Sequence, residues 1–385
     1  MNNIITKEVI DGKRVLLRSD LNVPIKDGVI LDDTRIRKSI KTIKFIIENN
    51  ASVIVMSHLG KVKTEEDMLK NTLAPVAKRL EELIKKEVIF INKPHGKLLE
   101  DTCKNLNPGQ IIMMENTRYE DVPYKLESNC DKKLSEYWAS LGDVFVNDAF
   151  GSSHRAHASV CGIRKFLPSY NGFLLEEEIN TLDKIIKHNE SPFLVIMGGA
   201  KVDDKIDLIK TLISKCDNLM VGGGIANTFL AALKYEIGSS LYSKDYLEEI
   251  KGIYENNSNK IVLPADVIVK RGTENINVDI DKVMSGDTIY DIGYKSINKF
   301  RNIIYNANTI FINGTVGLYE QEEYAKGTKE LLDACADSEA TVVAAGGDSV
   351  SAVNHFNHNT DFLVSTGGGA ALEYIAYGDL PGIVK

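Results

Sequence analysis

Three neighbouring segments decide the fold: VLLRSD at residues 15–20, RIRKSIKTIKFIIE at 35–48 and SVIVMSHL at 52–59. The first and the third are short apolar runs that end in polar residues, which is typical of buried strands. The middle segment has helical spacing, and one helix face carries the side chains of Ile36, Ile40, Ile43, Ile46 and Ile47. A strand, a helix and a second strand in this order predict a βαβ unit with parallel strands.

The same alternation of apolar runs and amphipathic patterns continues along the 385 residues. Further strands are predicted at 87–91, 111–116, 144–149, 193–198, 218–221, 260–269, 309–312, 341–345 and 362–365. A second helix is predicted at 69–86, with Pro75 in its first turn or at a kink. The pattern predicts an α/β protein with two Rossmann-like three-layer (αβα) domains and parallel sheets, joined by a long helix and a hinge.

The domain boundary is predicted near residue 170. A single long helix is expected at 173–188, between Pro168 and Pro192, and it would connect the two domains. The first domain is expected to cover residues 1–170 together with a C-terminal tail at 378–385, and the second to cover 171–377. The connecting helix and residues 376–385 are the candidate hinges.

Composition excludes several classes of protein. A net charge of -8 argues against wholesale nucleic-acid binding. No run approaches the roughly 20 apolar residues of a membrane helix, and MNNIITKEVIDGKR has no secretory h-region. The five cysteines are scattered and form no CxxC pair, so neither a disulfide framework nor a zinc site is indicated. We expect a cytoplasmic protein, and a monomer by default.

The arginines are concentrated in the first part of the chain. Only Arg271 and Arg301 follow residue 164, and the others are Arg14, Arg18, Arg35, Arg37, Arg79, Arg118, Arg155 and Arg164. Arginine is the side chain that binds carboxylate or phosphate in a bidentate manner. Surface solubility would not require such a distribution, so the first half is predicted to contain an anion site.

The predicted strands end differently in the two halves. In the first half the ends carry Arg, His, Asp or Asn, within segments 18–22, 57–60, 115–118 and 147–157. In the second half they carry glycines, within segments 198–201, 222–227, 313–317, 346–349 and 366–369. Ligands of open parallel sheets bind at the carboxyl ends of strands, and glycine lets phosphates approach the backbone and helix N-termini closely. The second half is therefore predicted to bind a ligand with phosphates and a flat moiety.

Two common nucleotide motifs are missing. The chain has no G-x-x-x-x-G-K-[ST] loop, and Gly222–Asn227 fails the G-x-G-x-x-G pattern at its last position. A P-loop enzyme is excluded and a nicotinamide-dependent oxidoreductase is disfavoured. An anion site in one half and a nucleotide site in the other suit phosphoryl transfer, in which the protein positions the reactants and neutralises charge.

The order of the motifs resembles that of the phosphoglycerate kinase family over essentially the whole chain. The matching segments are RSDLNVP, DDTRI, SHLGK, ENTRY, DAFGSSHRAHAS, GGAKVDDKI, GGGIANTFL, LPADVIV, DIGYKSI, NGTVGLYE, GGDS and STGGGAALE. The resemblance implies reversible phosphoryl transfer from 1,3-bisphosphoglycerate to Mg-ADP, which gives 3-phosphoglycerate and Mg-ATP. It also implies that the first domain binds the triose and that the second binds ATP or ADP, with Mg²⁺ as cofactor.

The resemblance assigns roles to individual residues. Asp20 and Asn22 would hold the glycerate, and Arg35 would reach the transferring phosphoryl group from the triose side. The remaining triose ligands would be His58, Lys61, Arg118, His154 and Arg155. One of the two histidines beside Arg155, His154 or His157, is alternatively structural. Lys201 would meet the phosphoryl group from the nucleotide side, and Gly346 is the third expected catalytic residue.

The nucleotide ligands are implied in the same way. Lys205 and Asn313 would lie by the phosphates, Asp348 would hold the metal-bound phosphates, and Glu320 would bind the ribose. The glycines that would flank the adenine are Gly198, Gly199, Gly222, Gly223 and Gly224. Gly347 and Ser349, like Gly346, would present hydrogen-bond donors to the phosphates. Asp348 is the only predicted metal ligand.

Several positions depart from the family pattern. Lys61 stands where an arginine is usual, and a lysine loses the bidentate grip on phosphate, so weaker triose binding is predicted. Thr315 replaces a proline, Leu21 replaces a phenylalanine, and Asp203 places an acid near the expected phosphate contacts. A non-catalytic descendant that keeps the fold is therefore the alternative function. Intact Arg35, Lys201 and Asp348 favour the enzyme.

Overall fold

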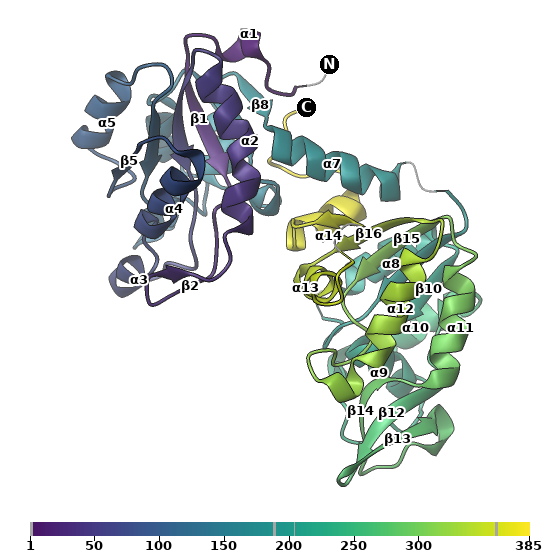
Figure 1. Cartoon of the computed structure of the whole chain (residues 1–385). Coiled ribbons are helices and arrows are strands. Elements are labelled where there is room, and N and C mark those ends of the chain that lie inside the picture. The colour runs from purple at the N-terminus through teal and green to yellow at the C-terminus, as the bar shows by residue number, and fades with distance from the viewer. Residues whose placement is uncertain (1–2, 188–189, 204, 359–360) are drawn as a thin grey trace. The chain divides into compact units, whose positions relative to one another are not determined.

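The computed structural model describes residues 3–187, 190–203, 205–358 and 361–385. The chain divides into two compact units, the first formed by Met1–Ile179 with Asp379–Lys385 and the second by Asn180–Gly378. Helix α7 (Phe173–Ile186) contains the point of division (Figure 1). The predicted end of this helix, His188, lies outside the described residues.

The first unit is built on a six-stranded parallel sheet with the order β5-β6-β4-β1-β7-β8. Its strands are β1 (Arg14–Ser19), β4 (Ser52–Met56), β5 (Val88–Ile91), β6 (Ile111–Met114), β7 (Val144–Asp148) and β8 (Ser169–Asn171). A short hairpin of β2 (Ile25–Lys26) and β3 (Val29–Ile30) precedes the first long helix. Strands β1, β4, β6 and β7 confirm the predicted positions.

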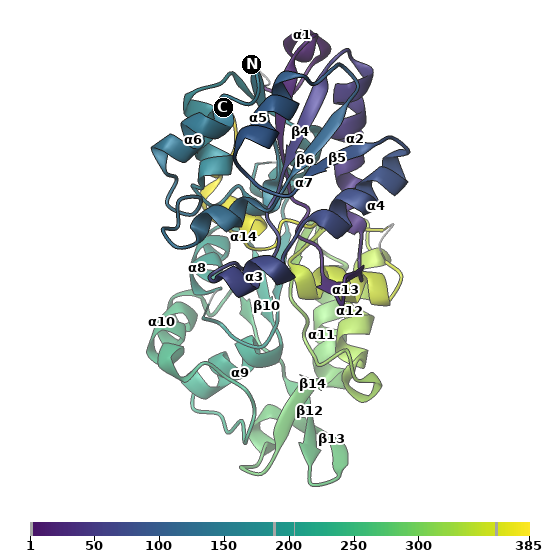
Figure 2. The same cartoon turned by 90° about the vertical axis from the view of Figure 1, so that its left-hand side faces the viewer.

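Helices cover both faces of this sheet (Figure 2). Alternate residues of β1 point to opposite sides, because Val15 and Leu17 belong to one hydrophobic cluster and Leu16 to another. The first cluster includes side chains of α2 (Thr34–Glu48) and α4 (Ala74–Ile84), and the second those of α5 (Lys97–Lys104) and α6 (Lys132–Ala139). Two further helices are α1 (Lys7–Ile10) and α3 (Glu65–Lys70). The predicted three layers are therefore present in this unit.

The second unit has a parallel sheet with the order β11-β10-β9-β15-β16-β17. Its strands are β9 (Phe193–Met197), β10 (Asn218–Val221), β11 (Ile261–Val262), β15 (Thr309–Asn313), β16 (Thr341–Ala345) and β17 (Leu363–Ser365). Its helices are α8 (Ile206–Lys215), α9 (Gly223–Ala232), α10 (Leu247–Asn257), α11 (Tyr294–Ile304), α12 (Lys326–Ala336), α13 (Gly347–His355) and α14 (Gly369–Tyr377). The predicted α/β class with parallel sheets is confirmed.

One strand prediction is wrong. The segment predicted as a single strand at 260–269 is divided between β11 in the parallel sheet and β12 (Asp266–Arg271) in a separate antiparallel sheet. The break falls at Pro264, which has no backbone N–H to donate to a sheet. Strand β12 pairs with β13 (Glu274–Asp279) and β14 (Thr288–Ile292), which the sequence did not predict.

The second predicted helix is also divided. Residues 69–86 contain the end of α3 and the whole of α4, and Pro75 occupies the first turn of α4, which is one of its two predicted places. No helix in the described part of the chain combines the length and the apolar character needed to cross a bilayer.

In each parallel sheet the order in which successive strands are added reverses once. In the first unit, β1 leads to β4 on one side while β7 leads to β8 on the other, so the carboxyl ends of β1 and β7 flank a switch point. In the second unit, β9 leads to β10 and β15 to β16, and a second switch point lies between β9 and β15. Such switch points are where open α/β sheets bind ligands. The two switch points are therefore the candidate ligand sites.

Candidate functional site

A cluster of basic residues lies at the switch point of the first unit, beginning with Arg18 at the end of β1. Its side chain is 1% exposed, and its Nε donates to Ser159 Oγ at 3.0 Å. Arg18 Nη2 lies 3.2 Å from His58 Nδ1. Because a guanidinium can only donate, Nδ1 of His58 accepts this bond, and the proton of the neutral imidazole sits on Nε2. Arg18 therefore fixes His58 as a hydrogen-bond donor.

The positive charge of the cluster appears in the titration of its histidines. Burial lowers the pKa of His58 well below its usual value, and the charges of Arg18, Arg118, Arg155 and Arg35 lower it further. Burial and the same kind of charges lower the pKa of His157 to about 3. Both imidazoles are therefore neutral at physiological pH. The arginine charges that contribute to these shifts also attract anions.

Two carboxylates accompany the arginines of this cluster. Glu127 is fully buried, and its Oε2 accepts from the backbone N–H of Ser159 at 2.9 Å. Burial raises the pKa of Glu127, while the charge of Arg18 opposes this rise. Arg118 contacts Asp121 at 3.4 Å, and its buried Nε has no hydrogen-bond partner within the described residues. An unpartnered guanidinium N–H in a basic cluster can donate to an anion.

Asp20, Asn22 and Arg35 form a second part of the same region. Arg35 Nη1 donates to both carboxylate oxygens of Asp20, at 3.0 and 3.1 Å, and to the carbonyl of Asn22 at 3.2 Å. The side-chain oxygen of Asn22 accepts from the backbone N–H of Gly60 at 2.8 Å. Thus the loops after β1 and β4 are joined, with Lys61 exposed directly beyond Gly60.

The loop after β7 carries the last two predicted triose ligands. Arg155 Nε lies 3.1 Å from His154 Nε2, and Arg155 is exposed. The C-terminal tail of this unit supports the loop, because Gly382 N–H donates to Ser153 O at 2.8 Å and Asn147 Nδ2 donates to Gly382 O at 2.8 Å. A Cβ on Gly382 would lie only 2.8 Å from the backbone of Ser153.

Sequence reasoning left two members of this cluster out of the predicted site. Arg18 was absent although a charged residue inside the apolar strand VLLRSD was an available signal. Glu127 was absent because nothing in its neighbourhood, KLESNC, distinguishes it from a surface acid. Only the fold brings it to Ser159, whose hydroxyl also binds Arg18.

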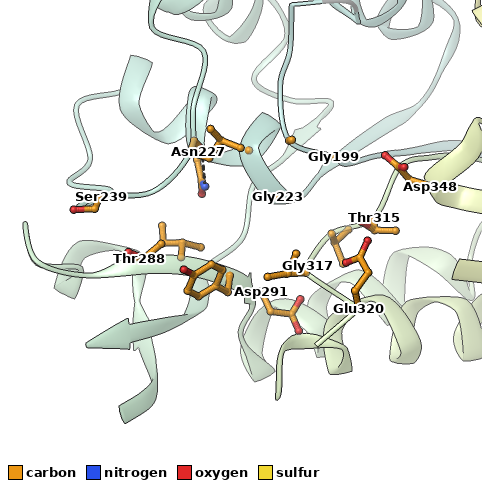
Figure 3. Close-up of a pocket in the computed structure, with 17 residues that line it drawn as sticks. Gly199, Gly223, Asn227, Ser239, Thr288, Asp291, Thr315, Gly317, Glu320 and Asp348 are labelled. Atoms are coloured by element: carbon orange, nitrogen blue, oxygen red, sulfur yellow. Dashed lines mark hydrogen bonds between the residues drawn. The ribbon is translucent and has the colours of Figure 1, made fainter. Parts of the chain in front are cut away.

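The second unit contains a pocket of about 440 Å³ at its own switch point (Figure 3). Of the predicted nucleotide ligands, Gly199, Gly223, Glu320 and Asp348 line it. Gly224, one of the glycines expected beside adenine, lines it as well. The other lining residues were not predicted as ligands, and they are Ala200, Asn227, Ser239, Leu241, Thr288, Ile289, Tyr290, Asp291, Thr315, Val316, Gly317 and Leu318. Most of these come from loops or from β14, whose approach to the glycine-rich strand ends depends on tertiary structure.

The glycines let three strand-end loops approach one another closely. Gly198 N–H donates to Asn313 O and Gly199 N–H donates to Thr315 O, both at 2.9 Å. A Cβ on Gly198 would lie 2.0 Å from Thr315 O, and one on Gly224 would lie 1.9 Å from Ala200 O. Such distances are far below van der Waals contact. The glycines that the sequence associated with phosphate approach are therefore also required by backbone packing.

Helix α13 presents its N-terminus beside the pocket. Gly346 precedes it with φ +93°, and Asp348 lies in the first turn. Ser349 Oγ accepts from Gly314 N–H at 2.6 Å, and Asn313 Nδ2 donates to Ala345 O at 2.8 Å, so the loops after β15 and β16 are held together. The free N–H groups of a helix N-terminus favour negative charge.

The remaining predicted residues lie around this pocket without lining it. They are Gly198, Lys201, Lys205, Gly222, Asn313, Gly346, Gly347 and Ser349. Lys205 Nζ donates to Gly198 O at 2.8 Å, and Lys201 is exposed in the loop between β9 and α8. Asp203, the acid noted in the sequence, accepts from the hydroxyl of Ser243 at 2.5 Å. Arg35 and Lys201 belong to different units.

Within the described residues, no group of three or more His, Cys, Asp and Glu side chains could hold a metal ion by itself. Asp348, at the N-terminus of α13, offers a single exposed carboxylate. One carboxylate suits Mg²⁺ that is bound together with substrate phosphates, because this ion keeps several waters and rarely uses a protein-only cage.

The comparisons with known proteins cover nearly the whole chain. The family model of phosphoglycerate kinase matches residues 5–377. The phosphoglycerate kinase of Lacticaseibacillus casei strain BL23 is 46% identical over 382 residues, which is 97% of this chain and 96% of the relative. That of Enterococcus faecalis is 45% identical over 383 residues, covering 98% and 96% of the two chains.

Solved structures give the same result. Phosphoglycerate kinase from Coxiella burnetii matches with a TM-score of 0.87 and 37% identity, over 97% of this chain and 96% of that one. The enzyme from Pyrococcus horikoshii OT3 matches with a TM-score of 0.82 and 32% identity, over 97% and 95%. With the ordered motifs, the two α/β units and these matches in agreement, the chain belongs to the phosphoglycerate kinase family.

Proposed function

We propose that the chain catalyses the reaction of its family in glycolysis, the reversible transfer of a phosphoryl group between 1,3-bisphosphoglycerate and ADP, by direct in-line transfer on closure of its two units. The observation that carries the proposal is the presence, on one chain, of a cluster of arginines around His58 and a glycine-lined pocket with a helix N-terminus beside it. Phosphoryl transfer needs such fixed positive groups more than it needs covalent chemistry.

The first unit binds the triose. Arg118 contributes a buried N–H that lacks a partner within the described residues, and neutral His58 contributes an Nε2–H donor oriented by Arg18. Asp20 and Asn22 bind the glycerate, and Lys61, His154 and Arg155 complete the site. Arg35 is held by Asp20 in the present arrangement, and its planar guanidinium grips two oxygens of the transferring group when substrate binds.

The second unit binds the nucleotide. The base lies between the glycine loops and the apolar side chains of the pocket, and Glu320 accepts from the ribose. Gly346, Gly347, Ser349 and the start of α13 bind the phosphates, together with Lys205 and Asn313. Asp348 would hold Mg²⁺, and the ion would supply positive charge to the phosphate oxygens. Lys201 approaches the transferring phosphoryl group from this side.

The mechanism requires the two units to close around their ligands. Helix α7 and residues 376–385 are the hinges, and closure brings Arg35 and Lys201 to one phosphoryl group. No general base is needed, because the attacking carboxylate or phosphate oxygen is already an anion, and no covalent enzyme intermediate forms. We further propose a cytoplasmic monomer without membrane partners, and the net charge of -8 disfavours nucleic-acid binding.

A coupled assay of ATP-dependent 1,3-bisphosphoglycerate formation tests this function. Arg35→Ala should lower kcat by roughly 100- to 1,000-fold, the usual cost of removing one transition-state contact. Arg37→Ala is the matched control, because Arg37 lies on the same helix and pairs with Asp33 at the surface. A wild-type chain that binds both substrates without turnover would instead support the non-catalytic descendant.

A further inference from the structure

The pocket of the second unit has two chemically different ends (Figure 3). Asp348, Thr315 and Glu320 lie on one side of the view, whereas Asn227, Ser239 and Thr288 lie on the other. The proposed function assigns the first end to phosphate and ribose, so the second end faces the nucleobase. Its side chains therefore decide which base the pocket accepts.

Asn227 is the most constrained polar group at this end. It lies on α9, is 3% exposed and lines the pocket. Its Nδ2 donates to Leu241 O at 3.1 Å, which fixes the orientation of the amide because a carbonyl oxygen can only accept. This bond uses one of its two N–H groups. The second N–H and Oδ1 have no partner within the described residues.

The other groups that line this end discriminate less. Leu241 is 52% exposed and, with the similarly apolar Ile289 and Leu318, it can cover a flat base without reading its edge. The hydroxyls of Ser239 and Thr288 can either donate or accept, so they adapt to different bases.

The buried acid in the middle of the pocket is already occupied. Asp291 is buried, and its two carboxylate oxygens accept from the backbone N–H groups of Gly327 at 2.7 Å and Ile292 at 2.8 Å. Among the described lining residues of this end, Asn227 alone offers a donor and an acceptor in a fixed orientation.

We propose that Asn227 reads the nucleobase edge and makes the pocket prefer adenine; this inference rests on the proposed nucleotide site. Adenine presents an amino donor at position 6 beside the acceptor N7, and an asparagine amide matches that pair. Hypoxanthine and guanine carry an oxygen at position 6. This oxygen would face Oδ1 of Asn227, and the two acceptors would repel each other instead of forming a hydrogen bond. A bidentate pair of this kind is expected to discriminate roughly 5- to 150-fold between bases.

Calorimetric titration of the full chain with ADP and IDP tests the inference, because the two ligands differ only at position 6 of the base and the adjoining ring nitrogen. Wild type should bind ADP at least about 5-fold more tightly than IDP. Asn227→Leu, of nearly the same volume, should bring the ratio close to 1. Asn256→Leu is the matched control, since Asn256 also donates Nδ2 to a backbone carbonyl but is exposed and outside the pocket.

A probe that leaves the protein unchanged makes the test independent of folding. Wild type should bind 7-deaza-ADP, which lacks the N7 acceptor, less tightly than ADP. Equal binding of ADP and IDP by wild type, or an unchanged ratio in folded Asn227→Leu, would overturn the role of Asn227 while leaving the nucleotide site intact. Failure of wild type to bind any of these diphosphates would overturn the site itself.

Discussion

The stability of the first unit in an Asp148→Asn variant, measured relative to wild type, should increase as pH rises. Asp148 ends β7 and is fully buried, and its Oδ1 accepts from the backbone N–H groups of Leu174 at 2.8 Å and Leu175 at 3.2 Å, in the first turn of α7. Asparagine keeps the accepting oxygen and the size of the side chain but cannot ionise.

The sign of the effect follows from the pKa of Asp148. Burial raises this pKa from 3.8 to about 7, against the lowering effects of the Thr42 hydroxyl and the N–H groups of Leu175 and Leu174. Between these two values the folded chain keeps a proton that the unfolded chain has lost. The free energy of unfolding of wild type therefore falls as pH rises through this window and levels off above about pH 7.

The size of the effect follows from the same window. Each pH unit within it is equivalent to about 1.4 kcal/mol, so wild type should lose about 3 kcal/mol between about pH 5 and about pH 8 from this group. Asp148→Asn lacks this loss. The difference in unfolding free energy between variant and wild type should grow by the same amount, whatever its value at the acidic end.

Urea unfolding followed by tryptophan fluorescence measures this quantity in the first unit alone. Trp138 is the single tryptophan, and it is completely buried there, with its indole N–H bonded to Pro94 O. Asp143→Asn is the matched control, because its bond to Arg14 lowers the pKa of Asp143 below 3.8 and leaves it ionised throughout the measured range. Parallel pH profiles for wild type and Asp148→Asn would refute the reasoning.

Three further predictions concern catalysis and binding. Lys201→Ala should lower kcat roughly 100-fold or more while ADP binding measured by calorimetry is retained, and a proportional loss of both would contradict a role in transfer. Lys61→Arg should lower the KM for 3-phosphoglycerate, because a guanidinium binds phosphate in a bidentate manner; an unchanged KM would show that this position does not touch the triose. Gly198→Ala should weaken ADP binding and lower the thermal stability of the second unit, since its Cβ would lie 2.0 Å from Thr315 O, and a variant with unchanged values would show that the loops have room to move.

Local patterns were sufficient for the fold class. The isoleucine face of the segment at 35–48 predicted α2, and its Ile36, Ile43 and Ile46 are buried in a hydrophobic cluster against the first sheet. The single strand predicted at 260–269 was wrong, although the sequence contains a local signal for the break. Pro264 stands between β11 and β12. The antiparallel strands β13 and β14 are only partly buried, and their weaker apolar pattern explains why the sequence did not predict them.

The sequence by itself determined the class of the two sheets, the positions of the glycine-rich strand ends and the family, because strand alternation, helical spacing and ordered motifs are local properties. Tertiary structure alone decided which distant groups meet: Glu127 and Arg18 on the hydroxyl of Ser159, Asn227 beside Leu241, and Asp148 at the start of α7. The physical reason is that burial and charge depend on neighbours from other segments. A carboxylate or an amide acquires its pKa or its fixed orientation only when packing removes water from around it.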